Sequence, residues 1–206
     1  MRTESQEPRE RLARRFGLSR QELSAIVFDS EESRLEQLGQ LLPRERWQRL
    51  AEKLGLKSAE EMEAFLQEFF AADALDTELL GYIRRMHGRY KTALLSNAWA
   101  NLAEMLHDRW HIDDCFDVTV ISALVGLTKP DPAIYHLTLS QLQVAPQEAV
   151  FIDDSAQNVE AAAALGIHAI QFTTREAVLT QLEELLQTEK PPKKPEKPVF
   201  SEKAGC

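Results

Sequence analysis

Two adjacent carboxylates, Asp153 and Asp154, directly follow the apolar run 149–152, which is typical of a buried strand. Carboxylates in that position are costly unless a cation or several hydrogen-bond donors compensate their charge. Magnesium keeps several waters and binds few carboxylates, so this pair fits a magnesium site. The alternative is that Asp154 or Ser155 only caps the helix that follows.

A hydroxyl and an amide, Ser96 and Asn97, follow a second apolar run, 92–95. Placed between a strand and a helix, these groups can hydrogen-bond an anionic oxygen. Taken alone, the pair also fits an ordinary helix cap. It therefore gains meaning only together with the other motifs.

A single lysine, Lys129, stands just before a sharply defined helix start. Asp131 as the N-cap and Pro132 as the first helical residue fix that start and hold the lysine close to it. A lysine so held can neutralise a phosphoryl group. The alternative is a surface lysine beside a capped helix.

From residue 76 onward, short apolar runs alternate with amphipathic stretches, which is the α/β pattern. This spacing predicts right-handed crossovers and a parallel sheet. Ligands of such sheets bind beyond the carboxyl ends of the strands, where the three motifs above lie. The expected strands are 92–95, 118–121, 149–152 and 169–172, and the expected helices are near 98–110, 132–142, 156–165 and 175–187.

Residues 1–75 show helical periodicity and almost no alternation of period two. Ser19 and Glu22 form a capping-box pattern that predicts a helix through Ile26 and Val27. The large apolar side chains of this part are expected to form its core. Helix-stop signals are expected at Gly17, Gly39, Pro43 and Gly55.

The chain has 206 residues and a net charge of −9, from 24 Lys and Arg against 33 Asp and Glu. That balance argues against a nucleic-acid-binding surface, which needs a dominant basic face. No apolar run approaches the roughly 20 residues of a membrane span, and the N-terminus is too charged for a signal peptide. Cys115 and Cys206 are far apart and form no Cys-x-x-Cys pair, so the sequence indicates neither a disulfide framework nor a zinc ribbon. This suits the reducing cytoplasm. Residues 189–206, rich in Lys and Pro, predict a disordered tail.

The combination of motifs is far more specific than its parts, and it resembles the haloacid dehalogenase-like (HAD) hydrolase superfamily. The resemblance covers residues 76–187, and residues 1–75 are similar to the helical cap of one branch. The tandem carboxylates resemble the magnesium-dependent phosphatases more than the metal-free dehalogenases. The motifs are Ser96-Asn97, then Lys129-Pro130-Asp131-Pro132 with Tyr135, then Asp153-Asp154 with Asn158 and Gly166.

The resemblance implies a Rossmann-like α/β core over 76–188 with a parallel sheet, and an all-helical cap over 1–75. It implies a phosphatase that acts on a small phosphorylated metabolite through an aspartyl-phosphate, with Mg²⁺ as cofactor. The implied roles are phosphoryl binding by Ser96, its positioning by Asn97, charge stabilisation by Lys129, direct magnesium ligation by Asp154, and support of the metal or its water by Asp153.

The superfamily's nucleophilic Asp lies on its first strand, which is central in the sheet. This chain instead begins with the polar residues 1–5, and no nucleophile is identified. We therefore expect an N-terminally truncated hydrolase that is inactive or poorly soluble as written, with an upstream extension supplying the strand. Asp29 follows a strand-like run, but the capping box at Ser19 places that run in a helix.

Two other functions stay open. A non-catalytic relative would keep Ser96, Lys129 and the carboxylate pair for binding phosphate or metal in a regulatory role. A haloacid dehalogenase is disfavoured by the metal-type carboxylate pair. His107 and His111, followed by Asp113 and Asp114, superficially resemble a zinc cluster, but histidines at a helix end are the better interpretation.

Overall fold

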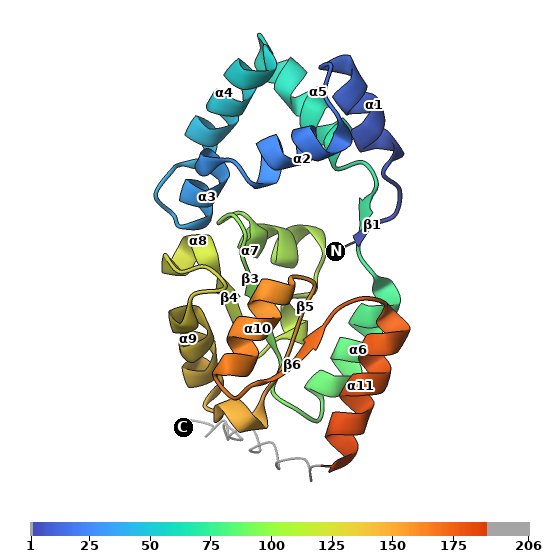
Figure 1. Ribbon diagram of the computed structural model, residues 1–206, viewed down its shortest axis with the longest axis vertical. Coiled ribbons are helices and arrows are strands. Elements are labelled where there is room, and N and C mark those ends of the chain that lie inside the picture. Colours follow the sequence, from blue (N-terminus) through green and yellow to red (C-terminus); the bar gives the residue numbers. More distant parts are fainter. Residues whose placement is uncertain (1, 189–206) are drawn as a thin grey trace, which may run out of the picture.

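Two parts of different construction follow one another along the chain, as the computed structural model shows for residues 2–188 (Figure 1). The predicted tail 189–206 lies outside the described residues. The first part is helical throughout and the second alternates strands with helices. The helical part comprises α1 (Glu7–Arg15), α2 (Arg20–Phe28), α3 (Glu31–Gln37), α4 (Pro43–Leu54) and α5 (Ala59–Phe69).

The second part contains four strands, each followed by helix, as the alternating pattern predicts. Within residues 2–188, no helix is both long and apolar enough to cross a membrane. The elements are α6 (Thr77–His87), β3 (Ala93–Ser96), α7 (Leu102–Glu104), a π-helical turn (Met105–Arg109), a 3₁₀ turn (Asp113–Cys115), β4 (Val118–Ile121), α8 (Ser122–Val125), α9 (Pro132–Leu142), a second 3₁₀ turn (Pro146–Glu148), β5 (Val150–Asp153), α10 (Ala156–Ala164), β6 (His168–Gln171) and α11 (Arg175–Thr188).

Local signals in the sequence set most helix boundaries. The capping box before α2 is confirmed: Ser19 Oγ accepts from the Glu22 N–H at 3.2 Å, and the Ser19 N–H donates to Glu22 Oε2 at 2.8 Å. Gly55 ends α4 in the left-handed conformation. Pro43 is a correction, because it begins α4 instead of stopping a helix. Its fixed φ and missing N–H suit the first helical residue.

A short antiparallel pair joins the two parts, and the sequence did not predict it. β1 (Arg2–Thr3) pairs with β2 (Asp73–Ala74), so the chain enters and leaves the helical part side by side. The carboxylate of Asp73 accepts from the Thr3 hydroxyl at 2.7 Å and from Arg9 Nη2 at 2.6 Å. Strands of two residues are too short for any alternation of polarity to appear.

The parallel strands form two separate pairs instead of one sheet. β3 pairs with β4 and β5 pairs with β6, and no described strand joins β3 to β5. All four residues of β3 are only partly buried, and Ile152 in β5 is 36% exposed. The outer strand β4, by contrast, ends in the buried Val120 and Ile121. Inner strands of a doubly covered parallel sheet are normally its most buried part.

The helical part packs against the segments that directly follow β3 and β4. In Figure 1, α3 lies over α8, the short helix that directly follows β4. Gly39, just after α3, comes so close that a Cβ added to it would lie 2.5 Å from the Ala123 carbonyl oxygen. Glycine is required here both for its φ of +67° and for this approach.

Gly39→Ala should therefore lower the free energy of unfolding more than Gly17→Ala, measured by chemical denaturation. Gly17 is a matched control because its φ is +68° and an added Cβ meets nothing within 4 Å. Gly17→Ala therefore measures only the cost of placing alanine in the left-handed conformation, about 1–2 kcal/mol. The clash should add about 1–3 kcal/mol at Gly39. Equal losses in the two variants would show that α3 does not pack closely on α8.

Candidate active site

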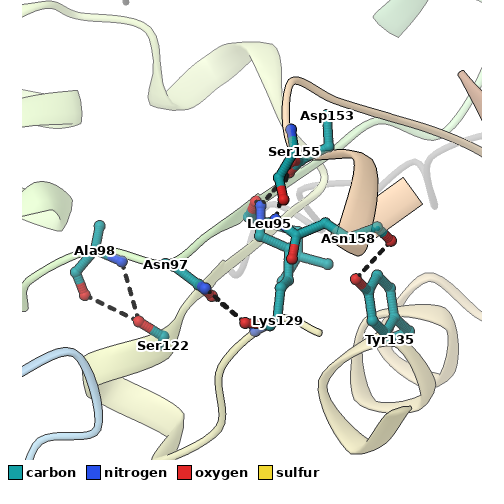
Figure 2. A network of polar contacts seen from close by, with 9 residues as sticks. All are labelled: Leu95, Asn97, Ala98, Ser122, Lys129, Tyr135, Asp153, Ser155 and Asn158. Atoms are coloured by element: carbon teal, nitrogen blue, oxygen red, sulfur yellow. Dashed lines mark hydrogen bonds and ion pairs between the residues drawn. The ribbon is translucent and has the colours of Figure 1, made fainter. Parts of the chain in front are cut away.

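The ammonium group of Lys129 lies between the two strand pairs (Figure 2). Its Nζ donates to the backbone carbonyl of Leu95 in β3 at 3.0 Å and to Asp153 Oδ2 in β5 at 2.6 Å. The side chains of Lys129 and Asp153 are only 8% and 7% exposed. Lys129 lies in the loop after β4 and α8, whereas Asp153 is the last residue of β5. This buried ion pair, together with the bond to Leu95, therefore holds the carboxyl ends of β3 and β5 together.

The carboxylate of Asp153 is fully engaged by donors. Besides Lys129, it accepts from the Ser155 N–H and from Asn158 Nδ2, both at 2.9 Å on Oδ1. Burial by itself raises the pKa of this carboxyl, but the hydrogen bonds from Lys129, Asn158 and Ser155 outweigh burial and lower it. Asp153 is therefore a fixed anion whose charge the protein already compensates.

The Asn97 side chain holds the backbone of Lys129 from both sides. Its Nδ2 donates to the Lys129 carbonyl and its Oδ1 accepts from the Lys129 N–H, each at 2.8 Å. Asn97 thus positions the lysine directly, and its amide is occupied in this arrangement. Ser96 is the half-buried last residue of β3, at the same edge.

Ser122, which the sequence analysis missed, fixes the loop after β3. Its hydroxyl, fully buried at the start of α8, accepts from the Ala98 N–H at 3.0 Å and donates to the Ala98 carbonyl at 3.1 Å (Figure 2). A serine at a helix start gives no sequence signal of such a distant partner.

The start of α10 is held by Tyr135 from α9. Its hydroxyl donates to the Asn158 carbonyl at 2.9 Å. Burial, together with the nearby charge of Asp153, raises the pKa of Tyr135 to about 12, so the phenol stays protonated and keeps donating. The predicted start of α9 is confirmed, because Asp131 Oδ1 accepts from the Ala133 N–H at 2.9 Å.

Asp154 differs from its neighbour because its side chain is exposed. An exposed carboxylate beside the site suits magnesium, which needs few protein ligands and keeps several waters. The donor set around Asp153 is less suitable, since that carboxylate already contacts an ammonium group. Within residues 2–188, no group of three or more His, Cys, Asp or Glu side chains is placed to hold a metal ion. Of the two carboxylates, the exposed Asp154 is the one whose chemistry suits a hard cation.

Two alternative sites from the sequence lie elsewhere. Asp29 is the C-cap of α2, exposed in the helical part, as the capping box predicts. His107 is exposed and contacts Asp113 at 2.8 Å through Nδ1. The hydrogen bond and charge of Asp113 raise the pKa of His107, which is the behaviour of a surface ion pair.

Lys129→Met should lower the free energy of unfolding at about pH 7 by about 3–5 kcal/mol, because it leaves the buried Asp153 charge unpaired. Arg34→Met, which breaks an exposed pair with Glu31, should cost about 0.5 kcal/mol or less. Chemical denaturation measures both.

The pH dependence of this loss has a definite sign. The lowered pKa of Asp153 gives the wild type a stabilisation that is present above the ordinary value of 3.8 and is lost as the pH falls below it. In Lys129→Met the carboxyl loses the largest contribution that lowers its pKa and stays buried, so its pKa lies above that of the wild type and protonation relieves the variant first. The gap between the two proteins should narrow from about pH 7 to about pH 4, and a constant gap would contradict the assigned pairing.

Known proteins resemble this chain over most of its length. A sesquiterpene phosphatase of Aspergillus oryzae is 29% identical over 163 residues, which cover 78% of this chain and 82% of that protein. A D-ribitol-5-phosphate phosphatase of Bacteroides thetaiotaomicron is 30% identical over 157 residues, 73% of this chain and 69% of that protein. The mouse acyl-CoA dehydrogenase family member 10 is 48% identical over 71 residues, but this match spans only 7% of its length.

Solved structures share the fold. A predicted HAD-like family hydrolase from Porphyromonas gingivalis has a TM-score of 0.72 at 21% identity and covers 89% of this chain and 91% of its own. A HAD family enzyme from Bacteroides thetaiotaomicron, in complex with magnesium and inorganic phosphate, has a TM-score of 0.67 at 22% identity over 83% of this chain and 88% of its own. The haloacid dehalogenase-like hydrolase family model matches residues 3–166. The chain therefore belongs to the haloacid dehalogenase-like hydrolase family.

Proposed function

We propose that this chain carries the phosphate-binding core and the cap of a magnesium-dependent phosphatase that acts on a small phosphomonoester. The observation that carries the proposal is the buried Lys129 ammonium, fixed at the carboxyl ends of β3 and β5 by Leu95 and Asp153. Ligands of open α/β sheets bind at that edge. Two relatives are named a sesquiterpene phosphatase and a D-ribitol-5-phosphate phosphatase.

The residues act on the phosphoryl group in distinct ways. Lys129 stabilises the charge of the phosphoryl oxygens, since its position is fixed before the substrate arrives. Asn97 positions Lys129 through two hydrogen bonds to the lysine backbone. Ser96 donates its hydroxyl to an oxygen of the phosphoryl group. Asp153 orients the ammonium group through its 2.6 Å contact with Nζ.

Asp154 would ligate magnesium, which when bound neutralises part of the negative charge of the phosphoryl group. Residues 1–75 act as the cap over a core formed by 76–188, and cap closure excludes water and selects the leaving group. The buried, unpaired thiol of Cys115 fits a reducing compartment, which supports the cytoplasm as the site of action.

Catalysis further requires an extended segment between β3 and β5 that carries an aspartate. The inner edges of both strands have no strand partner within the described residues, and β3 and β5 are unusually exposed for inner strands. A segment of the family's type, four apolar residues followed by Asp-x-Asp, would pair with both edges. Its first aspartate would take the phosphoryl group and release the alcohol, and water would then hydrolyse the aspartyl-phosphate.

Fusing such a segment ahead of Arg2 in β1 tests this requirement. We expect residues 1–206 alone to hydrolyse p-nitrophenyl phosphate at the background rate, and the fusion to hydrolyse it in the presence of magnesium. The gain should be several orders of magnitude, since removing a covalent nucleophile costs that much. A control fusion with Asn in place of both aspartates should fold equally well, by circular dichroism, and remain inactive.

Equal hydrolysis by residues 1–206 and by the fusion would contradict the requirement for a strand.

A non-catalytic, phosphate-binding regulatory role is the second candidate, favoured by the lack of a described carboxylate placed as nucleophile beside Lys129. Saturable binding of inorganic phosphate by calorimetry, with no turnover from either fusion, would support that role.

Asp154→Asn in the active fusion should raise the magnesium concentration for half-maximal activity by about 10–100-fold, because the amide is a poorer ligand for a hard cation. Asp29→Asn is the matched control: it changes an exposed Asp in the cap and should leave both the rate and the magnesium dependence unchanged. A magnesium dependence unaltered by Asp154→Asn would exclude this side chain as a ligand.

A further inference from the structure

Four aromatic rings meet where the helical part faces the core. Trp99, in the loop after β3, is surrounded by Phe28, Trp47 and Phe70 from the helical part, with ring centroids 6.5, 5.3 and 6.5 Å from its own. None of the four side chains is fully buried. The rings therefore present partly exposed apolar surface between the two parts of the molecule.

The position of Trp99 relates this surface to the phosphate site. Trp99 is two residues beyond Asn97, whose side chain holds Lys129. The intervening Ala98 is anchored on both its N–H and its carbonyl by the buried Ser122 hydroxyl. The loop is thus held by hydrogen bonds on the core side, and its Trp99 ring contacts the helical part. Under the proposed function, a leaving group that extends from Lys129 toward the helical part would meet this ring.

The charged groups around Trp99 are already neutralised. The Arg46 guanidinium lies against both the Trp47 and the Trp99 rings, at 3.9 and 4.0 Å from their centroids, and the two rings meet edge to face. Arg46 is 2% exposed and pairs with the equally buried Glu36 at 3.2 Å. This charge fixes the two indoles but offers little attraction to a charged or highly hydroxylated ligand.

Few polar atoms at the junction lack a hydrogen-bond partner. Among the residues that the structure describes, they are the buried donors Arg46 Nη1 and Trp99 Nε1 and the buried acceptor Glu36 Oε2, which lies 3.2 Å from Arg46 Nε as an ion pair. Buried donors normally find an acceptor, so an occasional ligand oxygen fits here. A polyol with a hydroxyl on every carbon would instead leave most of its hydroxyls against aromatic carbon, which is costly.

We propose that Trp99 is the specificity-determining residue and that the substrate is the monophosphate of a largely apolar alcohol, whose hydrocarbon part packs on the Trp99, Phe28, Trp47 and Phe70 rings. This inference rests on the proposed phosphatase function. Hydrocarbon buried against aromatic surface gains free energy in proportion to its area, whereas a polyol gains little.

Binding measured by titration calorimetry tests the proposal without requiring turnover. The probes are inorganic phosphate, hexyl phosphate and ribitol-5-phosphate, each titrated into residues 1–206 with magnesium. We expect hexyl phosphate to bind at least about tenfold more tightly than the other two. Trp99→Ala should remove about that factor for hexyl phosphate and leave inorganic phosphate unchanged.

Two further variants separate recognition from packing. Trp99→Phe keeps an aromatic ring and should retain most of the preference, even if Trp99→Ala does not fold. Trp110→Phe changes another tryptophan, in the hydrophobic cluster with Leu106 and Cys115, and should alter neither affinity nor preference. Circular dichroism and thermal unfolding verify that each variant is folded.

The outcomes distinguish this inference from the function on which it rests. Failure of all three probes to bind overturns the proposed function and the inference together. Binding of inorganic phosphate without preference for hexyl phosphate overturns only the inference. An equal loss for all probes in Trp99→Ala also overturns it, because the rings would then only hold the cap in place.

Discussion

The buried contact between the Lys129 ammonium and the Asp153 carboxylate is the constraint on which the rest of the core depends. Without a described strand between β3 and β5, the backbone hydrogen bonds that would hold them side by side are replaced by one lysine that reaches the Leu95 carbonyl and the carboxylate. A charge buried to this extent is tolerated only when it is paired, so the ion pair cannot relax without a large loss of stability. The position of the Lys129 ammonium group is therefore fixed by the same contact that joins the strand pairs.

Supporting contacts extend this arrangement outward. Asn97 fixes the lysine backbone, and Ser122 fixes the loop that contains Asn97. Trp99, in the same loop, packs against Trp47 of the helical part. The loop 97–99 thus contacts both the core and the helical part. Under the proposed function, these three consecutive residues would connect charge stabilisation at Lys129 with substrate selection at Trp99.

Much of the fold was predictable because its signals are local. The strand 118–121 and the helix 132–142 have the predicted bounds, and the capping box at Ser19 correctly separated a helix from a strand-like run. The pair β1 and β2 escaped prediction because two residues show no period, and Pro43 was misjudged because proline both ends and begins helices. Ser122 and Trp99 escaped because their partners are more than 20 residues away.

The sequence by itself determined the chemistry available to this protein: the types and order of Ser96, Asn97, Lys129, Asp153 and Asp154, and the strands and helices that bring them to one edge. These follow from side-chain chemistry and periodicity, which are properties of the chain. Only the tertiary structure decided how the two carboxylates differ, since burial and three donors fix one while the other stays exposed. The separation of β3 from β5 and the aromatic junction at the cap were likewise decided there, because pairing and burial depend on what lies beside a residue in space.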